Sequence, residues 1–442
     1  MKKYLLLFAA MLAASASQAD VVTDGATYTT TNNINCENLW IIDSYHNSTA
    51  LASEIYYTNY SGCRTAAIKD SLIYLACRSS SYAYVYRYYV ATGELKDYLT
   101  VTLDGSGLYG SYVANQIGFD SFGHLYLSDL TLASTSTQPV YVVDTETGAV
   151  SSTISLTKGA SIGRIDYIDV IGDLTGTEAP CTIMAAGAST AYVFGWTLAK
   201  GGTEWTGYYS GDAYKAMTSF YPTSESSWST APSIKILEGS GDAQYTGEYY
   251  CVDGTASYPT IYNASGEVVT SFASATSYVP TSVAVNGYAT FTYDDRTFIA
   301  YPMGDHSASS NNHAVNVCEV TSATSFADMA YYWTVPSTGL GATSDGGLRV
   351  ESIGYSYGTD SDGNQYVNLL VYKTRNGMAV YKISKEVTSG ISNTAGSNTV
   401  VAEKFYNLSG TQVAEPTDGT RAIYIVVKTY SDGTTRAVKE VR

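Results

Sequence analysis

The sequence is short of positive charge. Only 24 of its 442 residues are Lys or Arg, against 40 Asp or Glu, which gives a formal net charge of −16 at neutral pH. No run of basic residues interrupts this acidic background, and an acidic surface repels the phosphate backbone of a nucleic acid. Nucleic acid is therefore excluded as an expected partner.

Histidine, closely spaced cysteines and long apolar runs are also scarce. The chain has 4 His and 6 Cys and contains no Cys-x-x-Cys pair, so we predict neither a zinc site nor any other cofactor. Beyond the N-terminal segment no stretch approaches the roughly 18 consecutive apolar residues that a membrane-spanning helix needs. We therefore predict no transmembrane segment.

The N-terminal segment has the pattern of a secretory signal. Lys2 and Lys3 precede an apolar stretch from Tyr4 to Ala14, and the small residues that end at Ala19 follow it. This pattern predicts a signal peptide over residues 1–19. We expect the mature protein to be secreted, either extracellular or on the outer cell surface.

Tyr and Gly are what the chain has in quantity. It contains 42 Tyr and 39 Gly, and 45% of its residues are hydrophobic, which is enough for a large core. Tyr, Thr and Val favour strands and Gly favours tight turns, whereas the helix-forming residues are sparse. The composition predicts an all-β protein.

Two kinds of turn recur along the chain. Gly93, Gly148 and Gly266 occupy equivalent places in three similar turns, and Gly201 falls where a fourth is due. A second series of turns opens each unit at Asp70, Asp120, Asp173, Asp242, Asp294 and Asp362. Four short strands per unit, separated by Asp and Gly turns, are typical of the blades of a β-propeller.

The repeat predicts a six-bladed propeller closed by an N-terminal strand. The innermost strands are expected to begin near Arg64, Tyr112, Arg164, Ser233, Ser282 and Arg349. The last blade lacks a fourth strand, and Leu39–Ser44 can supply it by pairing with Met378–Ile383, which removes an open sheet edge. A seventh blade within residues 201–231 is the alternative count, and two β-sandwiches are the alternative fold.

The composition changes after Ile383. Residues 385–399 are rich in Ser, Thr, Asn and Gly and are predicted to be a linker. The predicted domains are thus a signal peptide (1–19), a propeller (20–384), this linker and a small β tail (400–442). Three strands are expected in the tail, namely Phe405–Val413, Ala422–Val427 and Val438–Arg442.

Two parts of the chain resemble known proteins. The tail, with a Tyr-Asn-Leu-Ser-Gly strand at Tyr406–Gly410 and an Ile-Tyr-Ile-Val strand at Ile423–Val426, is similar to the C-terminal tails of secreted Bacteroidetes proteins related to type IX secretion sorting domains. Its end lacks the usual Lys-Val-Val-Val run. The stretches Cys63–Ala67, Leu72–Arg78 and Ala91–Glu94 resemble uncharacterised secreted Bacteroidetes propellers. The resemblance implies the fold and export, not an activity.

Cys63 and Cys77 lie symmetrically about Asp70, the centre of a predicted hairpin. They would therefore face each other across two strands. Both a disulfide and a pair of buried free thiols fit this placement, and free thiols are the default interpretation.

Two motifs suggest catalysis but fit structural roles better. Gly159–Gly163 matches the nucleophile elbow of hydrolases, but a strand rather than a helix is predicted after it. Asp294 and Asp295 are adjacent, and adjacent residues on a strand point to opposite faces, so they cannot flank one glycosidic bond. We predict no catalytic residue.

Two further motifs suggest metal binding. Asp360–Asn364 resembles the start of a calcium loop, but an Asp-Gly strand turn is the interpretation that we favour. Asp305, His306 and His313 could ligate zinc, but their loop imposes no geometry and we interpret them as solvated loop residues. We predict no metal site.

Arg residues open three of the predicted innermost strands, namely Arg64, Arg164 and Arg349. Asp166 and Glu351 follow two of them at a spacing of two, which places each pair on one face of a strand. Because strand starts surround one mouth of a propeller channel, this set could bind a carboxylate or sulfate, with Arg64 the freest. Salt bridges between neighbouring blades are the interpretation that we favour.

Aromatic residues supply the remaining candidates. Trp205 and Trp228 lie in the long stretch 201–231, which fits a ligand-binding loop and an unrecognised strand pair equally well. Tyr residues at 82, 84, 86 and 88 alternate on one strand. We interpret them as packing between blades rather than as a sugar-binding platform.

These observations favour a non-catalytic binding propeller that holds a glycan or a protein at the mouth of its channel. The expected partner is a polysaccharide or a cell-surface protein. The alternative is a glycan-active hydrolase or lyase that uses channel carboxylates such as Asp166 and Glu351 with the Arg ring. Catalysis needs an acid and a base within reach of one bond, and the sequence shows no such pair.

Overall fold

The computed structural model describes residues 22–43, 46, 62–79, 82–158, 163–190, 192–207, 215–216, 228, 231–237, 239, 244–254, 257–272, 287–302, 313–341, 351–386, 400–415, 422–430 and 435–441. The predicted signal peptide and most of the predicted linker lie outside these residues. The chain divides into two compact units, residues 1–386 and 387–442.

The described residues of the first unit form six antiparallel sheets, each with a path of four strands. The first sheet consists of β2 (Gly62–Lys69), β3 (Leu72–Ser79), β4 (Tyr82–Tyr89) and β5 (Leu95–Thr100). The second consists of β8 (Gln116–Phe119), β9 (Leu125–Ser128), β10 (Thr137–Val143) and β11 (Val150–Thr157). The third consists of β12 (Arg164–Gly172), β13 (Cys181–Ala188), β14 (Tyr192–Leu198) and β15 (Trp205–Gly207). The fourth sheet consists of β17 (Ser233–Leu237), β18 (Tyr249–Gly254), β19 (Ser257–Asn263) and β20 (Val268–Ser271). The fifth consists of β21 (Ala289–Tyr293), β22 (Arg296–Pro302), β23 (Val315–Val320) and β24 (Ala330–Val335). The last consists of β25 (Glu351–Thr359), β26 (Gln365–Lys373), β27 (Gly377–Lys385) and β1 (Ile34–Asp43). The short pair β6 (Thr102–Leu103) and β7 (Ser106–Gly107) is separate.

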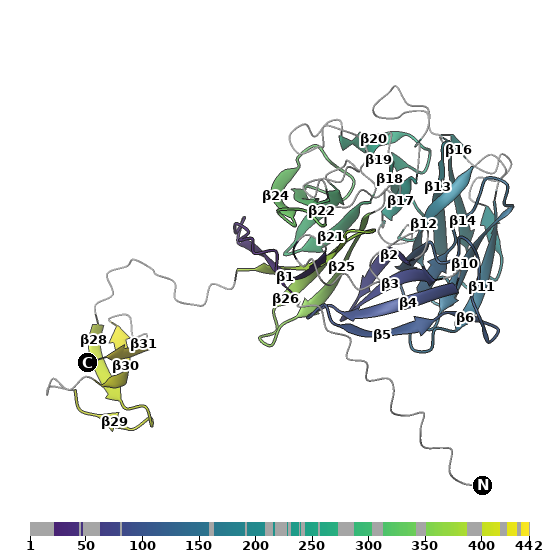
Figure 1. Ribbon diagram of the computed structural model, residues 1–442. Coiled ribbons are helices and arrows are strands. Elements are labelled where there is room, and N and C mark those ends of the chain that lie inside the picture. The colour runs from purple at the N-terminus through teal and green to yellow at the C-terminus, as the bar shows by residue number, and fades with distance from the viewer. Residues whose placement is uncertain are drawn as a thin grey trace, which may run out of the picture. The chain divides into compact units, whose positions relative to one another are not determined.

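The first strands of these sheets surround one cavity of about 720 Å³. The cavity is lined by residues of β2, β8, β12, β17, β21 and β25, and Figure 1 shows several of these strands facing the middle of the unit. Four-stranded sheets arranged around a shared cavity are the architecture of a β-propeller. The all-β prediction and the repeated four-strand unit are therefore confirmed.

The turns follow the predicted repeat. Gly93, Gly148, Gly201 and Gly266 all have φ between 71° and 76°, the left-handed region that Gly tolerates best. Asp70, at the centre of the β2–β3 hairpin, also has a positive φ, of 52°. At Gly93 a side chain is excluded for a second reason, because a Cβ atom would lie 2.7 Å from the Trp40 ring.

The starts of the first strands match the prediction unevenly. Those of β12 and β17 match, and β2 begins two residues before Arg64. The start predicted near Tyr112 is wrong by four residues, because residues 111–114 form a turn before β8. Ser282 and Arg349 lie outside the described residues.

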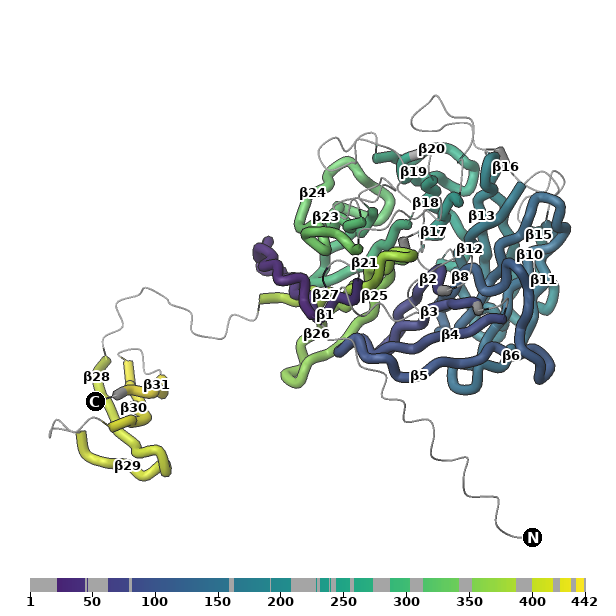
Figure 2. Tube along the Cα trace, viewed as in Figure 1, coloured from purple at the N-terminus to yellow at the C-terminus, as the bar shows by residue number. Residues whose placement is uncertain are grey.

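The N-terminal strand pairs with the last sheet, as predicted. In β1, Trp40 lies opposite Val380 and Asp43 opposite Gly377 of β27. Figure 2 shows this purple segment beside the yellow-green strands that end the first unit. The Trp40 indole is fully buried and donates a hydrogen bond to the Val90 carbonyl oxygen of another sheet at 2.7 Å.

Most of the stretch 201–231, where a seventh blade was the alternative, lies outside the described residues. Its described strands, β15 and β16 (Lys215–Ala216), both pair with β14. They therefore extend the third sheet.

The second unit is one small sheet with the strand order β29–β28–β30–β31. Its strands are β28 (Val400–Tyr406), β29 (Gln412–Val413), β30 (Ile423–Tyr430) and β31 (Thr435–Val441). The first predicted tail strand is corrected, because a hairpin at Asn407–Thr411 divides it between β28 and β29. Phe405 and Val426 are the buried hydrophobic residues of this unit in its described part.

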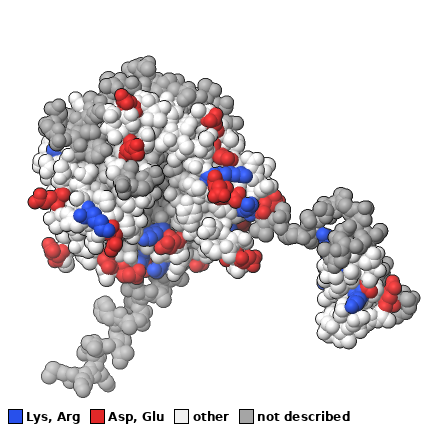
Figure 3. All heavy atoms as spheres, turned by 180° about the vertical axis from the view of Figure 1, so that it is seen from behind, with Lys and Arg blue, Asp and Glu red and all other residues white. Residues whose placement is uncertain are grey.

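No helix long and apolar enough to cross a membrane occurs among the described residues. Charged side chains are sparse on the described surface that Figure 3 shows, and several of the basic ones lie beside acidic ones.

Candidate functional site

The candidate site is the cavity between the first strands. We call the end where β2, β12 and β17 begin the start end, and the end where the first strands turn into the second strands the turn end. The lining runs along consecutive residues, such as Tyr167–Ile171 of β12 and Ser233–Leu237 of β17. The first strands therefore present an edge rather than a face to the cavity.

Side chains from neighbouring first strands cap these open edges. The Thr65 hydroxyl accepts a hydrogen bond from the Ile117 amide at 3.0 Å, and the Ser352 hydroxyl accepts one from the Ala66 amide at 3.0 Å. The Gln116 side chain donates to the Ile168 carbonyl oxygen and accepts from its amide, at 2.6 and 2.8 Å. Buried backbone groups need such partners, and each cap joins two sheets, so the cavity wall is preorganised.

A charged pair lies in the wall between β12 and β17. The Asp169 carboxylate accepts hydrogen bonds from Lys235 Nζ at 3.0 Å and from the Ile236 amide at 2.6 Å. Burial raises the pKa of Asp169, although Lys235 and the amide oppose this shift. Asp169, Lys235 and Asp120 are the charged residues of the described cavity lining.

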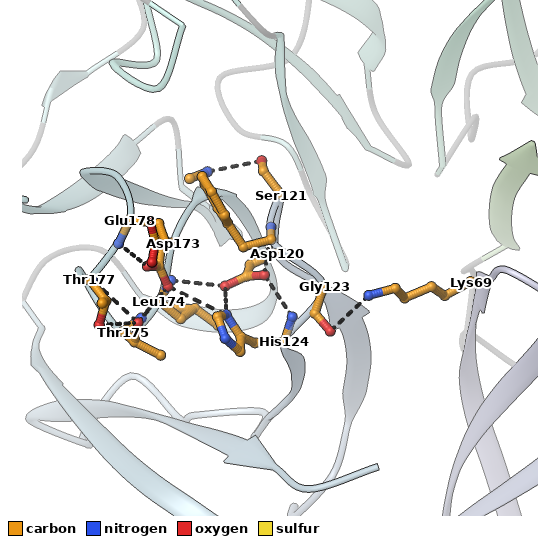
Figure 4. A network of polar contacts seen from close by, with 12 residues as sticks. Lys69, Asp120, Ser121, Gly123, His124, Asp173, Leu174, Thr175, Thr177 and Glu178 are labelled. Atoms are coloured by element: carbon orange, nitrogen blue, oxygen red, sulfur yellow. Dashed lines mark hydrogen bonds and ion pairs between the residues drawn. The ribbon is translucent and has the colours of Figure 1, made fainter.

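At the turn end, Asp120, His124 and Asp173 come close enough to hold a metal ion, with one ligand atom of each within 4.8 Å of the others. Figure 4 shows the His124 ring between the two carboxylates. However, the Asp120 carboxylate already accepts hydrogen bonds from His124 Nδ1 at 2.8 Å and the Leu174 amide at 2.9 Å. The Asp173 carboxylate likewise accepts a hydrogen bond from the Glu178 amide at 2.7 Å. These hydrogen bonds tie two hairpin turns together.

The same network continues around the turn end. Lys69 Nζ donates to the Gly123 carbonyl oxygen at 3.1 Å, which joins the first sheet to the second (Figure 4). Ser121 exchanges hydrogen bonds with Gly172 and joins the second sheet to the third. The Asp turns of the repeat are thus one source of contacts between sheets.

The predicted Arg cluster lies at the start end, just ahead of the residues that line the cavity. Arg164 Nε donates to the Asp166 carboxylate at 2.8 Å. Arg64 hydrogen-bonds to the Tyr167 side chain, and its charge also acts on Asp166. Burial raises the pKa of Asp166 despite these two cations. The structure therefore brings Arg64, Arg164 and Asp166 together.

The exposure within this cluster is the reverse of the expectation. Arg64 is 6% exposed, whereas the Arg164 side chain is 36% exposed. The charge of the buried Arg64 acts on Tyr372 of β26 as well as on Tyr167 of β12. Arg349 and the side chain of Glu351 lie outside the described residues.

The two candidate Trp residues pack against the core. Trp228 is 0% exposed and lies 6.1 Å from the Tyr262 ring, so it presents no surface to a ligand. Trp205 is half-buried on β15 and packs against the core of the third sheet. Full burial in a core with Tyr250 and Tyr262 does not fit the ligand-binding prediction for Trp228.

Cys63 and Cys77 form a disulfide between opposite residues of β2 and β3. The default interpretation of two free thiols is thus wrong for this pair. The other Cys residues, at 36, 181, 251 and 318, are free and buried.

The motifs set aside in the sequence prove mostly structural. The Asp360 carboxylate accepts hydrogen bonds from the backbone amides of Asp362 and Asn364 within its own turn. Asp294 and Asp295 form the β21–β22 turn, with φ of 51° and 59°. β12 directly follows Gly163, so the elbow lacks its helix. Asp305 and His306 lie outside the described residues.

His313 and the Tyr stripe need correction. His313 is 0% exposed and bonds to the Leu340 carbonyl oxygen, so it is not a solvated loop residue. In the stripe, Tyr88 is buried, and Tyr84 and Tyr86 pack against the core between two sheets, as predicted. Tyr82, in contrast, is 43% exposed.

Sequence reasoning missed the aromatic residues of the cavity wall. Phe291, Tyr355 and Tyr357 line the cavity between β21 and β25. The alternation of Ile353, Tyr355 and Tyr357 along a predicted innermost strand was the signal that could have found them.

No family model matches the sequence, and no curated protein matches it. Among solved structures, a mutant of AofleA from Arthrobotrys oligospora is 10% identical, with a TM-score of 0.44 and coverage of 87% of this chain and 91% of that one.

The WD40 domain of coronin from Toxoplasma gondii is 7% identical, with a TM-score of 0.43 and coverage of 84% and 90%. The endo-arabinase from Bacteroides thetaiotaomicron is 11% identical, with a TM-score of 0.30 and coverage of 59% and 88%. The propeller assignment rests on the sheets of this chain. The resemblance of its tail and blades to secreted Bacteroidetes proteins stays a prediction.

Proposed function

We propose that this chain is a secreted or cell-surface binding protein, a six-bladed β-propeller closed by β1, whose central cavity holds a glycan without catalysing a reaction. The observation that carries the proposal is the cavity itself. Its volume of about 720 Å³ lies within the range of small-ligand sites, and its lining mixes aromatic rings with Ser, Thr and Tyr hydroxyls. Such a lining matches the apolar faces and hydroxyl rims of sugars.

The charges of the cavity favour binding over catalysis. Asp120 accepts hydrogen bonds from His124 and Leu174, and Asp169 accepts them from Lys235 and Ile236. Both described carboxylates of the lining therefore have hydrogen-bond partners within the wall. A glycosidase instead needs two carboxyl groups that face one bond, one of them free to give up a proton.

Secretion and the tail complete the proposal. The pattern of residues 1–19 supports export. We assign the small β sheet of residues 400–442 the role of a sorting or attachment module, because it is compact by itself and resembles such tails. The partner of the mature protein would then be a polysaccharide at the cell surface.

A glycan array and a sugar-release assay on the same polysaccharides test the function. The mature full-length chain should bind at least one class of glycan and release no reducing sugar from it. Release of sugar would move the protein to the class of hydrolases or lyases. Absence of binding to every glycan would overturn the proposal.

A further inference from the structure

Three aromatic rings form a continuous row in the cavity wall between β21 and β25. Phe291 is 2% exposed, Tyr355 is half-buried and Tyr357 is 52% exposed. The ring centroids of Tyr355 lie 5.6 Å from those of both Phe291 and Tyr357. The row therefore leads from the core to an exposed ring near the turn end.

The exposed ring is held in place. The Tyr357 hydroxyl donates to the Thr292 carbonyl oxygen at 2.9 Å and accepts from the Thr292 amide at 3.3 Å. These bonds cap the open edge of β21 and anchor the β25 side chain to the neighbouring sheet. An aromatic ring whose orientation is fixed before binding loses little conformational entropy when a ligand stacks on it.

The surroundings of this ring suit a hydroxylated ligand. The residues that line the cavity around β21 and β25 include Thr290, Thr292, Thr297 and Ser352. Their hydroxyl groups can both donate and accept hydrogen bonds, as sugar hydroxyls require.

The charge of the turn end selects against anionic ligands. The described turns between first and second strands carry exposed carboxylates at Asp70, Glu178, Glu248, Asp295 and Asp362, whereas the exposed Asp294 is paired with Lys385. These carboxylates repel uronic acids and sulfated sugars as they approach. A neutral sugar is not repelled.

We propose that Tyr357 is the stacking platform of the cavity, against which a pyranose ring of a neutral glycan lies when the glycan binds from the turn end. The proposal rests on the proposed function and names the ligand class and the residue. Tyr offers an apolar ring face to the C–H groups of a sugar, and its hydroxyl is already satisfied by Thr292. A glycan of uronic acids or sulfated sugars is the contrasting class.

The chain offers a matched control in Tyr98 of β5. Tyr98 is 56% exposed, and its ring lies 6.1 Å from that of Tyr84 and 5.4 Å from that of Tyr86. It is thus as exposed as Tyr357 and also contacts other aromatic rings. It does not line the cavity.

The test titrates the mature full-length protein and its variants with cellohexaose, xylohexaose, mannohexaose and a galacturonate hexamer by isothermal calorimetry. Wild-type protein should bind at least one neutral hexasaccharide more tightly than the galacturonate. Tyr357→Ala should weaken that binding by about tenfold or more, the size of a lost aromatic contact. Tyr98→Ala should leave it unchanged.

A third variant separates stacking from the structural role of the tyrosine. Tyr357→Phe removes the cap on β21 and keeps the ring, so the melting temperature should fall while most of the affinity remains. If Tyr357→Phe and Tyr357→Ala lose affinity equally, or if Tyr357→Ala binds like wild type, the platform is overturned. Equal loss in Tyr98→Ala overturns it too.

The remaining outcomes distinguish the two proposals. Binding of charged glycans alone, on the array or in solution, overturns the neutral platform and leaves the glycan-binding function standing. Absence of binding to any glycan, on the array or in solution, overturns both.

Discussion

The burial of Arg64 assigns it to the structure rather than to a ligand. Its side chain is buried, it hydrogen-bonds to Tyr167, and its charge opposes the rise that burial causes in the pKa of Asp166. Arg164, which is more exposed, holds the same carboxylate through Nε. Removal of Arg64 leaves polar groups buried without their partner, and this costs more than the loss of a surface ion pair.

We therefore expect Arg64→Ala to lower the free energy of unfolding by about 2 to 4 kcal/mol, measured by chemical denaturation. Lys385→Ala is the control, because its exposed pair with Asp294 should be worth about 0.5 kcal/mol or less. Glycan affinity should change little in either variant. A stable Arg64→Ala protein with reduced affinity for acidic glycans would instead support the anion-binding alternative.

Asp253 predicts how stability depends on pH. Burial raises its pKa from 3.8 to about 7, although the Gly287 amide donates a hydrogen bond to it. The folded protein therefore binds this proton more tightly than the unfolded chain does. Since the unfolded chain releases it at lower pH, stability falls as pH rises from about 4 to 7.

Asp253→Asn should remove this part of the pH dependence. Between pH 5 and pH 8 the melting temperature of the variant should fall by less than that of wild type. Scanning calorimetry at several pH values makes the comparison. Asp360→Asn is a suitable control, because hydrogen bonds from Asn364 lower the pKa of Asp360 below 3.8, so its contribution changes only in acid and its profile from pH 5 to pH 8 should parallel that of wild type. Parallel pH profiles for wild type and Asp253→Asn would contradict the assignment.

At the scale of the element, β1 carries the closure of the last sheet. It contributes the fully buried side chains of Ile34, Trp40 and Ile41 and covers the edge of β27. An uncovered strand edge invites pairing with other chains.

We expect deletion of residues 20–45 to give a chain that aggregates or has a melting temperature far below that of the chain that starts at residue 20. Light scattering and thermal melts on the two proteins make the comparison. A deletion variant that remains monomeric and melts as the wild type does would show that β1 is dispensable, and the closed-ring proposal would fail with it.

At the scale of the whole molecule, the second unit has its own sheet and its own small core. Phe405 and Val426 are buried within it, and Lys428 pairs with Glu403 and Glu440 at 3.5 and 2.5 Å. Units with separate cores unfold independently when few contacts join them.

Truncation after Glu386 should therefore leave a folded first unit whose melting temperature changes by less than about 2 °C. Its near-ultraviolet circular dichroism should also match the corresponding signal of the full chain. A drop of many degrees on truncation would show that the tail stabilises the propeller and is not a separate module.

The local parts of this architecture could be predicted because they depend on neighbours in sequence. Gly93 and Gly148 mark turns since Gly tolerates a positive φ, and Asp70 marks a hairpin because Asp also tolerates this region. The pairing of Leu39–Ser44 with Met378–Ile383 followed from counting strands, because the last sheet lacked one. The hairpin centred on Asp70 also predicted that Cys63 and Cys77 lie opposite each other. Only the disulfide between them differs from the free thiols that the sequence favoured.

By itself, the sequence determined the all-β class, the repeat and the positions of most turns. The tertiary structure decided which residues meet at the cavity. In β12 every residue after Arg164 is buried, because other sheets pack against both faces of a first strand. The sequence of such a strand therefore shows no alternation of buried and exposed residues. The stagger of adjacent sheets then decides the role of each residue. It determines which residues line the cavity, which cap the strand edge of a neighbouring sheet and which are buried. That stagger placed Arg64 inside and left Tyr357 exposed, and no local pattern records it.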